Sequence, residues 1–168
     1  MDESKAKGYY VAATAVVPGE VTVVNKALRQ LTRAGQDRIH FKKESDSSRR
    51  KLLSQFCTLD LSVAVYVTKG LSDKEARERC LIALATDAAE AEVDLLMFER
   101  DESLVKADKR ILRETLVRLD CRTLRYDHAV PTAHPVLWVS DAVAWCYQAG
   151  GDWWRRAQPL VSEVRKLS

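Results

Sequence analysis

The sequence has no long apolar run, and its first residues lack the pattern of a secretory signal. No stretch of about 18 apolar residues, the length that a membrane-spanning helix needs, occurs in the 168 residues. Residues 1–7 (MDESKAK) are mostly charged and have no apolar core behind a basic start. We therefore expect neither a signal peptide nor a membrane partner.

Cysteine and histidine are also scarce. The chain has four cysteines, none in C-x-x-C spacing, and three histidines. This scatter argues against a zinc site and against a disulfide framework. We interpret the thiols as small buried hydrophobic groups in a reducing compartment, which predicts a cytoplasmic protein. The cysteines are Cys57, Cys80, Cys121 and Cys146.

The net charge is only +3, but it is unevenly distributed. Residues 26–51 contain nine bases and three acids, whereas residues 73–102 contain ten acids and four bases. A basic arm beside an acidic region is able to guide a polyanion toward carboxylate-bound cations. Two solvated helix faces of opposite sign would give the same pattern. The charge distribution leaves both interpretations open.

Hydrophobic periodicity predicts an α/β fold. Runs of β-formers predict strands at residues 8–17, 61–68, 94–99 and 121–126. Helical spacing and capping residues predict helices at residues 21–33, 49–56, 72–92, 103–119, 134–147 and 153–167, the last bent or split at Pro159. Residues 38–41 suit a short strand or an extended turn. Strands and helices alternate in the later part, so we expect a mixed central sheet flanked by helices. The length suits one domain, residues 1–168, with a helical insert at about 20–57.

Asp141 occupies an unexpected position within residues 134–147, which predict a helix that is apolar nearly all round. Burying an unpaired carboxylate costs roughly several kcal/mol. The carboxylate must therefore be paired, protonated, bound to a metal or placed at the lip of a cleft. Neutralisation by an internal arginine or contact with His134 is the structural alternative.

Asp108 and Glu99 are the next unusual acids. Asp108 lies on an apolar stripe, four residues after Leu104 and four before Leu112. Glu99 ends the apolar strand at 94–99, and ligands of α/β sheets bind at the carboxyl edge of the strands. Asp108 pairing with a neighbouring base and Glu99 ending a strand in solvent are the structural alternatives. The bases that Asp108 would meet are Lys109, Arg110 and Arg100.

Acids from separate elements near one sheet edge suggest a shared cation site. Carboxylate oxygens with few histidines suit Mg²⁺ or Mn²⁺. Two such ions about 3.5–4 Å apart activate water and stabilise the leaving oxygen in phosphodiester cleavage. That chemistry needs acids from at least three elements.

Short segments in a fixed order resemble the DUF 3800 family. Asp2-Glu3-Ser4 and the strand after it resemble the family's D-E-S-G opening, and residues 38–41 (RIHF) resemble its early I-H segment. Residues 96–101 (LMFERD), with Asp108, resemble its acid-bearing strand and the helix after it. Residues 137–144 (LWVSDAVA) resemble its closing L-Q-x-A-D-x-x-A helix. The resemblance spans nearly the whole chain and implies an RNase H-like fold.

The resemblance also implies a set of site residues. In an RNase H-like fold the first strand, the end of the fourth strand and the last helix each carry a metal-binding acid. These positions correspond to Asp2, Glu99 and Asp141, of which Asp2 rests on the resemblance alone. Asp108 is expected as a further ligand or a supporting acid. The expected substrate contacts are His40, Lys42, Lys43, Arg49 and Arg50.

These expectations lead to one principal hypothesis and two rivals. The first is a nuclease or related phosphoryl-transfer enzyme that uses Mg²⁺ or Mn²⁺ on a nucleic-acid phosphodiester. The second is a catalytically silent module on the same fold that binds nucleic acid or protein. The third is an adaptor that forms a homo-oligomer through the C-terminal helix, with Trp153 and Trp154 as its contact.

Overall fold

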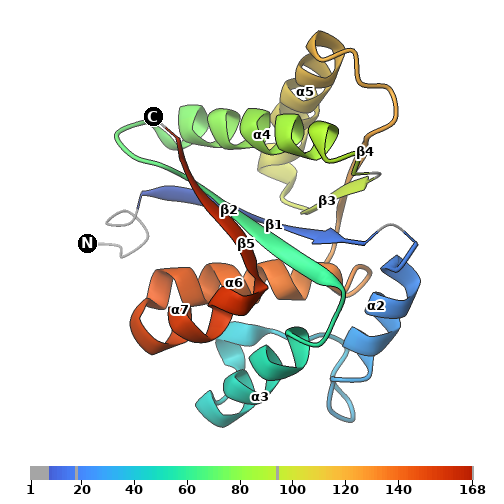
Figure 1. Ribbon diagram of the computed structural model, residues 1–168, viewed down its shortest axis with the longest axis vertical. Coiled ribbons are helices and arrows are strands. Elements are labelled where there is room, and N and C mark those ends of the chain that lie inside the picture. The colour runs from blue at the N-terminus through green and yellow to red at the C-terminus, as the bar shows by residue number, and fades with distance from the viewer. Residues whose placement is uncertain (1–7, 18, 94, 168) are drawn as a thin grey trace.

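The computed structural model describes residues 8–17, 19–93 and 95–167. It is a mixed α/β structure with a three-stranded and a two-stranded sheet (Figure 1). In the larger sheet, β2 (Leu61–Thr68) lies between β1 (Tyr9–Val16) and β5 (Val161–Leu167). The β1–β2 pair is antiparallel and the β2–β5 pair is parallel. In the smaller sheet, β3 (Leu95–Glu99) pairs in parallel with β4 (Arg125–Ala129). The expected α/β class is confirmed.

Helices cover both faces of the larger sheet (Figure 1). One face carries α4 (Asp73–Glu90) and α5 (Glu102–Arg118). The other carries α6 (Val136–Ala149), α7 (Gly151–Ala157), α3 (Asp46–Phe56), α2 (Val21–Arg29) and the 3₁₀ turn η1 (Phe41–Lys43). No described helix is long and apolar enough to cross a bilayer.

Strand periodicity divides the buried side chains between two cores. Val63, Val65 and Val67 of β2 pack beneath α6, whereas Tyr66 packs beneath α4. Because successive side chains of a strand point to opposite faces, an apolar strand such as β2 supports both cores at once. This explains why the middle of β2, residues 63–67 (VAVYV), carries no charged residue on either face.

Side-chain caps fix several helix starts. The Ser72 hydroxyl accepts a hydrogen bond from the Glu75 amide at 3.3 Å, as the predicted capping box requires. Ser45 caps α3 and Asp101 caps α5, in each case by accepting from a backbone N–H. These caps begin α3 and α5 one to three residues earlier than the sequence predicted.

The predicted C-terminal helix at residues 153–167 is wrong beyond its first turns. The helix α7 ends at Ala157, a 3₁₀ turn (η2, Gln158–Leu160) contains Pro159, and β5 follows. Proline has no N–H to continue a helix, and the unpaired edge of β2 accepts the following residues as a strand. Val161, Val164 and Leu167 recur every third residue, and this spacing resembled a helix face.

One further boundary differs from the prediction, and the structure decides between the two alternatives for residues 38–41. The strand β4 begins at Arg125, four residues after the predicted start, because the chain first turns through residues 119–124. The segment at 38–41 is an extended stretch that runs into η1 rather than a paired strand. In both places a short run of β-formers was not enough to define a strand, since pairing depends on the neighbouring edge.

Candidate functional site

A cleft of about 630 Å³ lies where the carboxyl end of β3 meets β1 and α6. Glu99 enters it from the end of β3, and Asp141 enters it from the middle of α6. The cleft therefore brings together two of the three acids that the sequence pattern predicts, independently of the family resemblance, to be unusual. Its other polar lining residues are Tyr10, Arg77, Arg100, Asp101 and Ser140.

Asp141 lies at the lip of the cleft. Its side chain is 39% exposed, whereas its neighbours Ser140 and Ala142 on α6 are buried. The helix α6 is thus buried except where Asp141 reaches the solvent of the cleft, which explains how a carboxylate occurs in this apolar sequence.

The two carboxyl groups interact directly. Partial burial raises the pKa of Asp141 to about 6, with further contributions from the negative charge of Glu99 and a hydrogen bond between the two side chains. Arg38 opposes this rise, and its Nη2 lies 3.5 Å from Asp141 Oδ2. A carboxyl group whose pKa is raised beside a second carboxyl group suits a shared proton or a bound cation, because two adjacent negative charges repel each other.

His40 is close enough to Glu99 for the charge of that carboxylate to affect its pKa. Burial lowers the pKa of His40, as do the charges of Arg38 and Lys43, while the charge of Glu99 partly opposes the shift. Its Nδ1 is buried and has no hydrogen-bond partner among the described residues. His40 is therefore an uncharged imidazole near neutral pH.

Asp108 does not join the carboxyl pair. It is fully buried, and its two oxygens accept hydrogen bonds from Arg77 Nε and Nη2, each at 2.8 Å. His128 Nε2 lies 3.0 Å from Oδ2 of the same carboxylate. Burial alone would raise the pKa of Asp108, but the bonds to Arg77 and His128 outweigh it and hold the pKa below its usual value. Pairing with basic groups therefore describes Asp108 better than metal binding does. Its partners are Arg77 and His128 and not one of the three bases near it in the sequence.

The predicted substrate-binding bases divide into two groups. Lys42, Lys43 and Arg50 are exposed. Arg49 is held inside: its side chain is 13% exposed and donates to the Phe41 carbonyl at 3.1 Å. Its guanidinium also lies 4.2 Å from the centre of the Trp145 ring. Arg49, a residue of α3, thus contacts both η1 and α6. We therefore assign it a structural role and not a phosphate contact.

Of the predicted metal-binding acids, only Glu99 and Asp141 line the cleft among the described residues. Asp2 lies outside the described residues. Within residues 8–17, 19–93 and 95–167, no three His, Cys, Asp or Glu side chains are grouped so that they could hold a metal. The described part of the site is thus a two-carboxylate pair.

The tryptophans of the adaptor hypothesis are half-buried. Trp153 packs edge-to-face against Trp145 with ring centres 5.4 Å apart, and Trp154 packs against Tyr147 at 5.2 Å. Both rings extend the core beneath α6. The contact proposed for a homo-oligomer is therefore largely used within the chain.

Sequence reasoning missed Arg38 and Asp101 as site residues. Arg38 was counted only as one charge of the basic segment, although it stands two residues before His40. Asp101 lines the cleft two residues after Glu99, and there it caps α5. Each of the two lies two residues from a predicted site residue, and this closeness in the sequence was the signal that could have identified them.

No protein-family model, no curated protein and no solved structure matches this chain.

Proposed function

We propose that the protein is a metal-dependent nuclease or related phosphoryl-transfer enzyme on an RNase H-like fold. The observation that carries the proposal is the Glu99–Asp141 pair, in which one carboxyl has its pKa raised to about 6 at the carboxyl end of a parallel strand pair. Perturbed acids in a cleft are frequent at functional sites. The order of acids along the chain also supports the proposed relation to DUF 3800.

The chemistry of the pair suits Mg²⁺ or Mn²⁺. Magnesium is commonly bound through one or two carboxylates together with substrate phosphates, and it keeps several waters. Glu99 and Asp141 supply two carboxylates at an open cleft and leave room for such a shell. When bound, the cation supplies Lewis-acid activation of water and of a phosphoryl oxygen.

The surrounding residues have defined roles in this proposal. Arg38 fixes the Asp141 carboxylate and places a positive charge at the cleft. The uncharged His40 imidazole accepts or relays a proton beside the pair. Lys42, Lys43 and Arg50 hold the phosphate backbone from the exposed surface next to His40.

A direct test is calorimetric titration of the protein with Mn²⁺ at pH 7. We expect binding that is lost in Asp141→Asn and retained in the control Asp120→Asn, whose side chain is exposed. Binding should also release protons near pH 6, because the cation favours the ionised Asp141. Equal Mn²⁺ binding by Asp141→Asn and the unchanged protein would refute this site.

The catalytic part is tested with fluorescent single- and double-stranded DNA and RNA. Cleavage should require Mg²⁺ or Mn²⁺, and Glu99→Gln should abolish it without lowering the unfolding temperature. The matched control is Glu114→Gln, an exposed acid on α5. Loss of cleavage in both variants would argue against a specific role for Glu99.

One observation favours the catalytically silent module instead. Although Asp101 also lines the cleft, no three acids of the described residues are grouped so that they could hold a metal, and two-metal cleavage needs more ligands than the pair supplies. A silent module would bind nucleic acid through the exposed bases without a metal requirement, and its affinity would fall steeply with salt. Nucleic-acid binding that persists in EDTA without cleavage under any metal condition would favour this function.

A further inference from the structure

The two sheets present unpaired edges to each other. In the described part of the chain β1 pairs only with β2, and β3 pairs only with β4. The start of β1 and the end of β3 line the cleft of the carboxyl pair. The end of β1 and the start of β3 line a second cavity of about 560 Å³. The strands β1 and β3 therefore run past each other in opposite directions.

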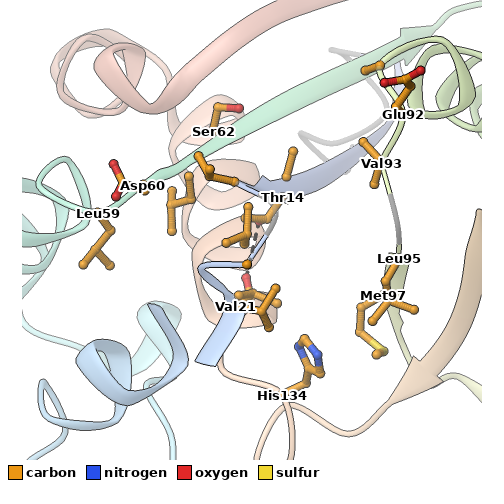
Figure 2. A pocket seen from close by; sticks show the side chains of 17 residues that line it. Thr14, Val21, Leu59, Asp60, Ser62, Glu92, Val93, Leu95, Met97 and His134 are labelled. Carbon is orange, nitrogen blue, oxygen red and sulfur yellow. Dashed lines mark hydrogen bonds between the residues drawn. The ribbon is translucent and has the colours of Figure 1, made fainter. Parts of the chain in front are cut away.

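Met97 lines both cavities, so they adjoin at β3, and we name this pair of cavities the intersheet slot. Its walls are the unpaired edges of β1 and β3. Figure 2 shows its second cavity, with Val93, Leu95 and Met97 across the opening from Thr14.

The strand β1 has the composition of a central strand. It contains no charged residue and no proline, the devices that protect natural edge strands from pairing with other chains. Tyr10 and Ala12 pack into the core beneath α6, while Val11 and Ala13 pack into the core beneath α4. Both faces are therefore covered, and among the described strands none pairs with the hydrogen-bonding edge of β1 that faces β3.

The charge of the intersheet slot is opposite to that of the whole chain. Five acids and two arginines line it, although the chain carries a net charge of +3. Both arginines are engaged: Arg77 donates to Asp108, and Arg100 donates to Glu102. The acids are Asp60 and Glu92 at one end and Glu99, Asp101 and Asp141 at the other.

We propose that the intersheet slot binds an extended segment of another polypeptide, basic at both ends and apolar between them. The segment would add as a strand between β1 and β3, with main-chain hydrogen bonds to both edges and alternate side chains in the two cores. It would join the two sheets into one. Residues 1–7 of this chain match that description poorly, because they carry four charges and no β-branched residue.

Strand addition requires a small movement. Some Cα atoms of β1 and β3 lie within 8 Å of each other, whereas two ladder spacings need about 9.6 Å. Wherever such a pair of atoms occurs, the sheets must therefore separate by at least about 1.6 Å. This opening predicts that binding changes the environment of Met97, which contacts both cavities.

The test uses a synthetic peptide as long as β1, with alternating valine and threonine between terminal lysines, in EDTA. We expect fluorescence anisotropy to show binding and hydrogen exchange to slow in both β1 and β3. The same peptide with a central proline, or with terminal glutamates, should bind at least about tenfold more weakly, since it loses ladder hydrogen bonds or meets like charges. Equal binding of all three peptides, or no binding, would overturn the proposal.

A protein variant separates this slot from the carboxyl pair. Glu92→Lys lies at the end remote from Glu99 and should weaken the peptide about fivefold, whereas the exposed control Glu114→Lys should not. An unchanged affinity in Glu92→Lys would count against the proposed charge match. Binding that arises only after deletion of residues 1–7, or protection of β1 in a self-associated form without peptide, would show that this chain itself fills the slot and would overturn the partner proposal.

Discussion

Replacing Asp141 by asparagine should stabilise the protein at neutral pH. The carboxyl ionises at about 6 in the folded protein and at 3.8 in its ordinary state. Between these values the folded state binds more protons than the unfolded state, so stability falls as pH rises from about 4 to 6. The loss of stability caused by ionising Asp141 is absent below pH 3.8 and complete above pH 6. An uncharged asparagine at this position removes that loss.

The expected magnitude follows from the size of this pKa change. A rise from 3.8 to about 6 corresponds to about 3 kcal/mol for a fully shielded group. Because 39% of the Asp141 side chain is exposed, solvent screening reduces this value, and we expect about 1 kcal/mol. For a chain of this size, 1 kcal/mol shifts the unfolding temperature by about 2–4 °C.

The assay is urea unfolding of the unchanged protein and of Asp141→Asn at pH 4 and pH 8. The difference in unfolding free energy should be near zero at pH 4 and about 1 kcal/mol in favour of the variant at pH 8. The control Asp120→Asn should show no such pH dependence, since its exposed residue has a left-handed backbone that asparagine also tolerates. A variant that is less stable than the unchanged protein at pH 8 would refute the reasoning.

Added Mn²⁺ should reverse the order of stability. A cation that binds only the folded state at about 100 times its Kd stabilises it by about 2.7 kcal/mol. The unchanged protein should gain this stability, and Asp141→Asn should gain little. An equal gain in both proteins would place the Mn²⁺ site elsewhere.

Three further perturbations test the surrounding structure. Arg77→Met should cost about 3–5 kcal/mol in urea unfolding, because it leaves the fully buried Asp108 carboxylate without its main partner; a loss under 1 kcal/mol would contradict this. Asp87→Asn should speed hydrogen exchange in β5, since this carboxylate binds both Tyr66 of β2 and an arginine of β5; unchanged exchange would exclude that role. Gly8→Ala should lower the unfolding temperature, because its φ is +83° and a Cβ atom would lie 2.2 Å from the Thr68 carbonyl oxygen; an unchanged temperature would show that the turn adapts.

The sequence alone predicted those features whose local residue pattern already determines their structure. The strands β1, β2 and β3 were predicted within about one residue of their ends, because their apolar runs are bounded by clear turn residues. Asp141 was also identified correctly as an unusual acid. An apolar helix with one carboxylate has few stable arrangements, and the lip of a cleft is one of them.

The same reasoning could not distinguish Asp141 from Asp108. Both acids lie on apolar helix stripes, but Asp108 is neutralised by Arg77 and His128, which are 31 and 20 residues away. Asp141 instead meets Glu99 at an open cleft. Periodicity reports that a position faces the interior, whereas the charge that meets it there depends on which elements pack together.

The C-terminal strand and the intersheet slot were likewise decided by tertiary structure. Residues 161–167 carry a helix-like spacing, yet they form β5 because β2, about 100 residues earlier, offers a free edge. The opening between β1 and β3 has no signature in either strand, since each reads as an ordinary buried strand. Composition and periodicity determined that β1, β2 and β3 are extended and that Asp108 lies on a buried face, but the pairing of edges and charges depends on contacts between distant parts of the chain.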